Sequence, residues 1–305
     1  MPAREHPTVL AQNLAGDDFI IGVEMSPPRG YMPHKVLAGA HLLAEAGADV
    51  IHVADAPLAR MRMSAWAVAH LLQREVGAEA VLHFPTRGRN LLRVQGDLLA
   101  AHALGVRNLF VIMGDPTSLG DHPQAMDSYD LAPTALIELV KQSFNSGRDH
   151  AGQSLGQPTR FVVGCALNMC SRDYERELRL FRRKVRSGAD FAVTQPVFSA
   201  QTVQHFVRRF QSTHGGAMLP VMVGVLPLHS ERHARFLQNE VPGVEIPAVV
   251  IERMRSTADP SAEGASIAFE LLSELRKIEG VRGVYLIPPF GRYQVVAEIM
   301  QALSR

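Results

Sequence analysis

The chain of 305 residues is poor in cysteine, in long apolar runs and in excess charge. Its two cysteines, Cys165 and Cys170, exclude a disulfide framework and a zinc site made of four cysteines. No apolar stretch approaches the about 20 residues that a bilayer-spanning helix needs, and the start, MPAREHPTVLAQN, lacks the apolar centre of a secretory signal. We therefore expect a soluble, cytoplasmic protein with reduced thiols and no membrane partner.

The charges nearly cancel, with 31 Lys and Arg residues against 30 Asp and Glu residues and a net charge of +1. This balance lacks the basic excess that holds a nucleic-acid backbone, so no nucleic-acid partner is expected. The phosphate-binding motifs of Rossmann folds and of P-loop proteins are also missing. His229 and His233 have a spacing that suits a metal, but no third ligand accompanies them, so no metal site is expected. The oligomeric state stays open, with a homo-oligomer among the options.

One pattern recurs five times along the chain: a helical stretch, a glycine, a small or branched residue, a charged residue, and then an apolar run. The five glycines are Gly47, Gly77, Gly105, Gly188 and Gly280. Each glycine is typical of the left-handed residue that ends a helix, and each run after it is typical of a strand. The runs are almost wholly apolar, which favours a parallel sheet that is buried on both faces.

Three further apolar runs, at 19–26, 160–167 and 220–227, bring the number of expected strands to eight. Amphipathic stretches separate them, and no linker or shift of composition divides the chain. Eight strands that alternate with helices predict a single-domain (β/α)8 barrel, a TIM barrel, over residues 1–305, with residues 1–18 as an N-terminal extension. An open doubly wound sheet is the alternative. The two longest connections, 115–131 and 144–159, are polar and rich in turn residues, and the first should overhang the mouth of the barrel.

Chemistry in such a barrel gathers at the carboxyl ends of the strands. Most of the residues at these ends are polar, although the strands themselves are apolar; the set is Glu24, Asp55, His83, Asp115, Asn168, Gln195, Pro227 and Pro288. Polar groups that converge in an apolar cup are typical of a small-molecule site.

Each of these residues also has a purely structural interpretation. In this interpretation Glu24 is a strand-end acid that pairs with Arg29, and His83 is a core histidine. Asp115, between Gly114 and Pro116, serves only the turn. Gln195 caps its strand through a backbone hydrogen bond. Burying an unpaired carboxylate inside an apolar run costs free energy, and this favours a functional role for Glu24.

The residues resemble those of the methylenetetrahydrofolate reductase family, most closely the reductase half of bifunctional homocysteine methyltransferase/reductase enzymes. The resemblance runs from about Phe19 to Met300. The segments that carry it include VEMSPPRG, MGDPTSLGDHP, GCALN, FRRKVRSGADFAVTQPVF and YLIPPFGRY. It implies a (β/α)8 barrel that reduces 5,10-methylenetetrahydrofolate to 5-methyltetrahydrofolate. It also implies that NADH or NADPH supplies the hydride and that FAD passes it on.

The resemblance also assigns roles to individual residues. It implies that Glu24 is the general acid that protonates the folate, and that Asp115 stabilises the positive charge that develops there. It implies that Gln195 and Phe198 contact the folate. For FAD it implies contacts by His83, Gly114, Asp115, Tyr129, Arg183 and Lys184.

The chain departs from the family pattern at several positions that contact flavin in relatives. Ala54, Met113 and Leu180 stand where some members have polar residues. Gly88, in Thr86-Arg87-Gly88-Arg89-Asn90, replaces an acid of the usual C-R-D-R-N segment. Two alternatives follow: direct hydride transfer from nicotinamide to folate in the same pocket, or a non-catalytic folate-binding partner of a methyltransferase.

Overall fold

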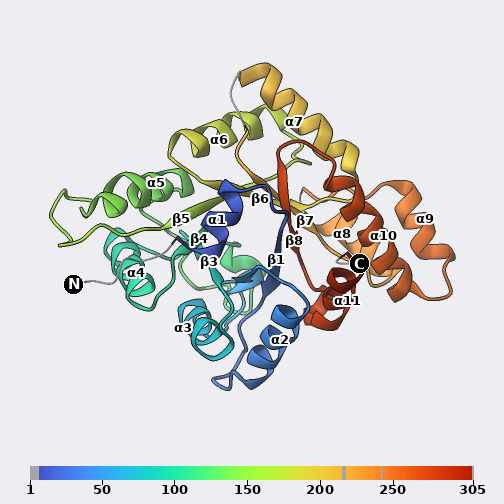
Figure 1. The fold of residues 1–305 in the computed structure, drawn as a ribbon, viewed down its shortest axis with the longest axis horizontal. Helices are drawn as coiled ribbons and strands as arrows, with labels where there is room; N and C mark the ends of the chain where they lie inside the picture. Colours follow the sequence, from blue (N-terminus) through green and yellow to red (C-terminus); the bar gives the residue numbers. More distant parts are fainter. Residues whose placement is uncertain (1–6, 215–217, 242, 304–305) are drawn as a thin grey trace.

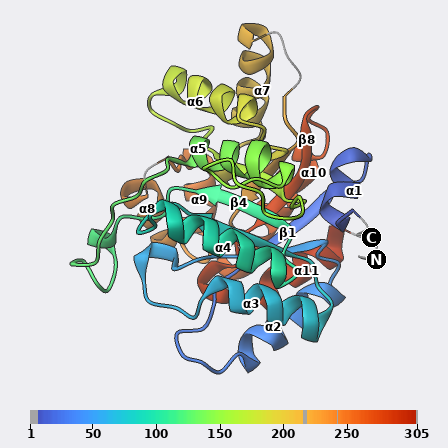
Figure 2. The ribbon, with the colours of Figure 1, turned by 90° about the vertical axis from the view of Figure 1, so that its left-hand side faces the viewer.

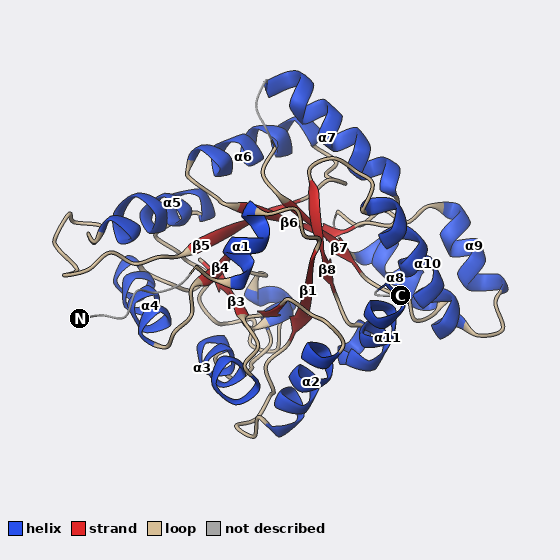
Figure 3. Ribbon diagram, viewed as in Figure 1, coloured by secondary structure: helices blue, strands red, loops and turns tan. Residues whose placement is uncertain are grey.

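The computed structural model describes residues 7–214, 218–241 and 243–303. Eight parallel strands close into a barrel in which each strand pairs with its neighbours in the chain and β1 pairs with β8 (Figures 1 and 3). The strands are β1 Ile20–Met25, β2 Val50–Val53, β3 Ala80–Pro85, β4 Asn108–Ile112, β5 Val162–Leu167, β6 Phe191–Pro196, β7 Val221–Val225 and β8 Val281–Leu286. The TIM barrel expected from the sequence is therefore confirmed, and the open sheet is excluded.

All the helices except the first form a ring around the strands and cover their apolar outer faces (Figure 1). They are α1 Val9–Ala15, α2 His34–Glu45, α3 Ala65–Leu71, α4 Leu91–Ala103, α5 Pro133–Glu138, α6 Tyr174–Arg186, α7 Ala200–His214, α8 Glu231–Glu240, α9 Ala248–Ser256, α10 Pro260–Leu275 and α11 Tyr293–Leu303. None of the helices in the described ranges is long and apolar enough to cross a bilayer.

The five glycines of the repeated pattern all have left-handed backbones, with φ between 73° and 98°. Each lies between a helical segment and the strand that follows it. Since an L side chain is strained in this region, glycine is the residue that allows the chain to leave the helix and enter the barrel at once. The repeat thus predicts the corners of the barrel correctly.

Helix α1 closes the amino-terminal end of the barrel. Its Leu10 is fully buried among the residues of the barrel interior. The backbone N–H groups of Val9 and Leu10 donate to the Glu79 carboxylate at 2.6 and 2.9 Å, and Asn108 donates to the same carboxylate at 2.8 Å. Figure 1 shows α1 over the ring of strands, and Figure 2 shows it at the end opposite the connection that follows β4. The predicted N-terminal extension therefore includes a structural plug, while residues 1–6 lie outside the described residues.

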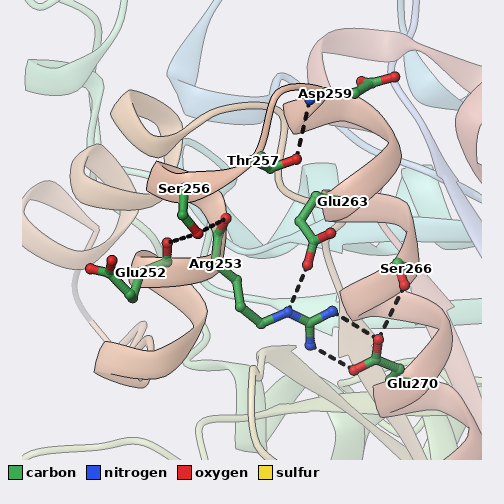
Figure 4. A network of polar contacts seen from close by, with 8 residues as sticks. All are labelled: Glu252, Arg253, Ser256, Thr257, Asp259, Glu263, Ser266 and Glu270. Carbon is green, nitrogen blue, oxygen red and sulfur yellow. Dashed lines mark hydrogen bonds and ion pairs between the residues drawn. The ribbon is translucent and has the colours of Figure 1, made fainter.

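Three helices, α8, α9 and α10, stand between β7 and β8, where a simple barrel has one. Arg253 of α9 joins α10 through Glu263, at 2.6 Å from Nε, and through Glu270, at 2.6 and 2.8 Å from Nη1 and Nη2 (Figure 4). The two-pronged contact with Glu270 fixes the direction of the guanidinium as well as its distance. It holds the additional helix against the outer ring.

Candidate active site at the mouth of the barrel

A cavity of about 380 Å³ opens at the carboxyl ends of the strands. Its lining brings together six residues that the sequence singles out: Glu24, Asp55, His83, Gly114, Asp115 and Gln195. Apolar side chains, among them Phe110, Val193 and Ile287, form the rest of the wall together with Tyr285. The size and the mixture of groups suit the ring system of a small molecule.

Glu24 is half-buried at the end of β1, where the hydroxyl group of Tyr285 on β8 donates a hydrogen bond to its Oε2. Burial raises the pKa of the Glu24 carboxyl above its usual range, the hydrogen bond from Tyr285 opposes this rise, and the negative charge of Asp115 adds to it. The expected alternative partner, Arg29, instead lies 3.4 Å from Asp121. Glu24 is therefore an acid that holds its proton to higher pH than an ordinary glutamate.

Two histidines, His52 and His83, lie close together in the barrel, and His83 lines the cavity. His52 on β2 is fully buried, and neither of its ring nitrogens has a hydrogen-bond partner. His83 on β3 is 5% exposed, and its Nε2 is also without a partner. Burial lowers the pKa of His83 to about 3, and burial together with His83 lowers the pKa of His52. Both rings are therefore neutral at physiological pH, and the unsatisfied Nε2 of His83 belongs to a residue that lines the cavity.

Asp115 follows Gly114, whose φ of +91° makes the corner after β4. Its Oδ2 accepts a hydrogen bond from the backbone N–H of Leu58 at 2.7 Å, and its backbone carbonyl accepts one from Arg87. Leu58 belongs to a strap, residues 56–59, in which Ala56, Leu58 and Ala59 all have left-handed backbones. Strained non-glycine residues of this kind are concentrated at binding sites. Asp115 thus ties the strap to the mouth of the cavity.

A β-bulge directs Gln195 toward the open mouth. The register between β6 and β7 shifts between Val193 and Pro196, and the Thr194 hydroxyl accepts a hydrogen bond from the Gly224 N–H at 2.8 Å in place of a ladder partner. Bulges reorient side chains in this way. The Gln195 side chain is exposed, so its amide is available to a ligand instead of capping the strand.

Asp55 is already paired inside the protein. Its Oδ2 lies 2.8 Å from Nη2 of Arg89, whose Nε lies 3.2 Å from Asp97. The guanidinium also stacks over Trp66 at 4.9 Å. Asp55 therefore belongs to a buried structural network at the edge of the cavity.

Five other predicted residues lie outside the cavity lining. Phe198 is buried in an apolar cluster with Leu226 and Leu228, and Asn168 lines a separate surface cavity. Tyr129 is 44% exposed on the connection after β4, and Arg183 is exposed on α6. Lys184 donates to the Ala166 carbonyl of β5 at 2.6 Å and lies 3.9 Å from Glu177. The ligand contacts assigned to Phe198, Tyr129, Arg183 and Lys184 stay predictions.

The sequence interpretation misses Tyr285 and His52. One residue near the carboxyl end of each strand was singled out there, whereas inward-facing residues recur at every second position. Counting back by two from Ala54 reaches His52, and counting back by two from Ile287 reaches Tyr285. The alternation therefore contained the signal. Among the described residues, no group of three or more His, Cys, Asp or Glu side chains is arranged to hold a metal ion.

Comparison with protein-family models matches residues 9–303 to the family described as methylenetetrahydrofolate reductase. Among curated proteins, the chain is 24% identical over 172 residues to the probable methylenetetrahydrofolate reductase (NADPH) of Caenorhabditis elegans, which covers 54% of this chain and 24% of that protein. It is 20% identical over 221 residues to methylenetetrahydrofolate reductase 2 of Schizosaccharomyces pombe, which covers 71% of this chain and 34% of that protein. The chain thus spans about a quarter to a third of the length of these relatives.

Among solved structures, a protein from Clostridium thermocellum, described as binding two copies of 5-methyl-5,6,7,8-tetrahydrofolic acid, superposes with a TM-score of 0.67. The match covers 97% of this chain and 98% of that one at 11% identity. A 2,3-dimethylmalate lyase matches with a TM-score of 0.51 at 15% identity, covering 97% of this chain and 82% of that one. These similarities show the fold. Because the family match extends over nearly the whole barrel, the chain belongs to the methylenetetrahydrofolate reductase family.

Proposed function

We propose that this chain reduces 5,10-methylenetetrahydrofolate to 5-methyltetrahydrofolate, with NADH or NADPH as the source of hydride. The observation that carries the proposal is the Glu24 carboxyl, which has a raised pKa and faces the same cavity as Asp115 and Gln195. An acid, a second carboxylate and an amide around one apolar space are the groups that this reduction requires.

Glu24 is the proton donor in this proposal. Its raised pKa leaves a larger protonated fraction near neutral pH, so it can protonate a nitrogen of the folate five-membered ring. The ring then opens to an iminium ion, which accepts hydride. The Tyr285 hydroxyl holds the carboxyl in place and can stabilise the carboxylate that remains after proton transfer.

Asp115 and Gln195 hold and stabilise the folate. The negative charge of Asp115 favours the positive charge of the iminium ion, and the Coulomb interaction is strengthened by the apolar wall. The Gln195 amide both donates and accepts, which matches the alternating donors and acceptors along a pterin edge.

The residues present fit a flavin ring at the mouth, since His83, whose buried Nε2 is unsatisfied, lines the cavity together with Gly114 and Asp115. These residues would hold the FAD ring, with Tyr129, Arg183 and Lys184 toward its diphosphate. Bound FAD would relay hydride from nicotinamide to folate.

Direct hydride transfer from nicotinamide to folate is the second candidate, and a specific observation favours it. The Lys184 ammonium is engaged by Ala166 and Glu177, and apolar side chains occupy positions 54, 113 and 180. Fewer polar groups are therefore available to a flavin than in the family pattern.

The test is the visible spectrum of freshly purified protein, followed by anaerobic addition of reduced nicotinamide and then of folate substrate. Flavin absorbance that bleaches with nicotinamide and returns with folate supports the FAD route. Direct transfer is supported if the protein is colourless, oxidises reduced nicotinamide only when the folate substrate is present, and does not quench the fluorescence of added FAD. Folate binding without turnover under any of these conditions contradicts the enzymatic proposal and supports a non-catalytic folate-binding partner of a methyltransferase.

A further inference from the structure

A second cavity, of about 610 Å³, adjoins the mouth and is lined by arginine. Its charged lining consists of Arg60, Arg62, Arg87, Arg89 and Arg93 with only two acids, Asp55 and Asp97. Five guanidinium groups against two carboxylates leave an excess of three positive charges around one space, in a chain whose net charge is only +1.

The two acids are not available to the other arginines. Asp97 lies 3.2 Å from Nε of Arg89 and 2.9 Å from Nε of Arg93, and Asp55 lies 2.8 Å from Nη2 of Arg89. Within the described part of the chain, Arg60, Arg62 and Arg87 have no carboxylate partner. Three cationic groups in one cavity are therefore uncompensated.

The Arg62 side chain adds an independent observation. Its Nε is buried and has no hydrogen-bond partner among the described residues. A buried N–H donor without an acceptor is costly, and charged donors are the most costly of all. Arg62 is therefore the group in this cavity that gains most from an acceptor supplied by a ligand.

The acids near the cavity are occupied by other partners. Asp121 Oδ1 accepts a hydrogen bond from the Met61 N–H at 3.0 Å and lies 3.9 Å from the lining His122. Among the described residues, its Oδ2 is buried without a hydrogen-bond partner, and its only cation is Arg29 at 3.4 Å. Asp127 accepts from the Thr117 N–H with both oxygens at 3.0 Å. Gly88 of the lining stands where the family pattern has an acid, which removes one further negative charge.

The arginine cavity lies next to the site where the reaction is proposed. Asp55 lines both spaces, and the strap 56–59 contributes Pro57 to the mouth and Ala56 and Ala59 to the arginine cavity. The connections after β2, β3 and β4 supply the arginine cavity together with helices α3 and α4, and Arg93 and Asp97 lie on α4. Arg183 and Lys184, on α6 after β5, are not part of its lining.

We propose that the arginine cavity is an anion subsite that binds the multiply charged oxyanion portion of a substrate whose ring lies in the mouth. Arginine favours phosphate and carboxylate oxygens because its N–H groups match their spacing. Two sources share this chemistry, namely the phosphates of a nicotinamide dinucleotide and the linked carboxylates of a folate glutamate tail. The inference rests on the proposed function only for the identity of the molecule, dinucleotide or folate, that carries the anionic groups.

The test is calorimetric titration of the full chain with inorganic pyrophosphate and, separately, with a γ-linked triglutamate, each at low and at high salt. Binding of pyrophosphate identifies the nucleotide as the source, and binding of triglutamate identifies the folate tail. In either case the affinity should fall steeply with salt.

Arg60→Gln, which changes an exposed residue, should weaken binding about tenfold, as expected for one charge-assisted hydrogen bond. Arg208→Gln, on an exposed face of α7, should have no effect.

A pair of variants at position 88 tests the role of charge at constant shape. Gly88 has a φ of +67°, and an added Cβ would lie 3.3 Å from the Met126 carbonyl oxygen. Asn and Asp tolerate left-handed backbones about equally, so Gly88→Asn and Gly88→Asp share this strain and differ by one charge. Gly88→Asp should weaken anion binding about tenfold relative to Gly88→Asn.

Absence of binding by both probes, or equal binding by the Asp and Asn variants and by Arg60→Gln, would overturn the inference. Anion binding in a protein that shows no folate reduction would contradict the proposed function and leave the subsite standing. Folate reduction without anion binding would contradict the subsite and leave the proposed function standing.

Discussion

Gln195 is the residue whose replacement should affect folate alone. Under the proposed function, Gln195→Leu removes both hydrogen bonds that the amide would make to the pterin edge and leaves their partners unsatisfied, at a cost of about 1–3 kcal/mol. The folate KM should therefore rise about 5- to 150-fold, while the Kd of reduced nicotinamide stays unchanged. Steady-state kinetics with each substrate varied in turn measure both quantities, and Gln204→Leu on α7 is the control. An equal loss of nicotinamide affinity would show that Gln195 serves the barrel instead.

His83 should make stability depend on pH. Its pKa is about 3 in the folded protein, and the ordinary value of a histidine is 6.5, so between these values the unfolded chain binds a proton that the folded chain does not. The stabilising contribution is complete above pH 6.5 and is lost as pH falls, by about 2 kcal/mol between pH 6.5 and pH 5. Urea unfolding at several pH values across this range gives the free energy of unfolding as a function of pH. The slope of that free energy reports the protons taken up on unfolding, and His83→Gln should reduce this number by about one. Parallel slopes would contradict the account.

Single site residues were predictable where a charged side chain stands within or beside an apolar stretch of the sequence. A glutamate inside the apolar run 19–26 and an aspartate after VIMG are visible in the sequence, and both line the mouth. Tyr285 was not identified, because a tyrosine in an apolar strand is chemically ordinary until its hydroxyl meets Glu24 across the β1–β8 pair. The internal engagement of Lys184 was equally invisible, since it depends on the distance between α6 and β5.

The corner after β4 places Asp115, and its geometry depends on Gly114. With φ at +91°, an added Cβ would lie 3.0 Å from Pro85 Cβ and 3.2 Å from Arg87 Cβ. Gly114→Ala should therefore cost about 1–2 kcal/mol in backbone strain, and it should lower turnover because Asp115 moves. The contrasting variant is Gly96→Ala in α4, where nothing lies within 4 Å and helix propensity predicts a gain of up to about 1 kcal/mol. Urea unfolding measures the free energy of unfolding of both variants. A Gly114→Ala protein as stable as wild type would contradict the claim that position 114 requires glycine.

Elements were predictable where one residue type determines the backbone. The glycine corners are such elements, because only glycine adopts those φ values without strain. The strap 56–59 is the opposite case, since Ala56, Leu58 and Ala59 give no sequence signal for a left-handed backbone. Their conformation is held from outside, by Asp115 on the Leu58 N–H and by Gly120, where an added Cβ would lie 2.0 Å from the Ala59 carbonyl oxygen.

For the whole molecule, closure of the barrel by α1 should contribute to stability but not to binding. Leu10→Ala empties a fully buried position in the barrel interior and should cost about 2–5 kcal/mol. Val9→Ala, at a residue that is 45% exposed, should change stability by less than about 0.5 kcal/mol. Denaturant unfolding measures both, and the folate KM of each folded variant should equal that of wild type. A large shift of that KM in Leu10→Ala would show that the two ends of the barrel are coupled.

The overall architecture was predictable because eight strand signals alternate with helical stretches along the chain. The role of the first 18 residues was not, because α1 has only seven residues and is too short to show a periodicity. Its function depends on Glu79, which lies 69 residues away from Leu10 in the chain. Contacts of this range become visible only when the barrel is closed.

The most direct measurement of the central claim is a single-turnover assay of wild type and Glu24→Gln with reduced nicotinamide and 5,10-methylenetetrahydrofolate. Product is quantified as 5-methyltetrahydrofolate by mass spectrometry. The variant keeps the shape of the side chain but cannot donate the proton. Wild type should form one 5-methyltetrahydrofolate for each nicotinamide oxidised. In Glu24→Gln the rate should fall by about 10²- to 10⁴-fold, as for a lost general acid, with the Kd of nicotinamide unchanged. A near-normal rate in Glu24→Gln, or no methylated folate from wild type, would contradict the account.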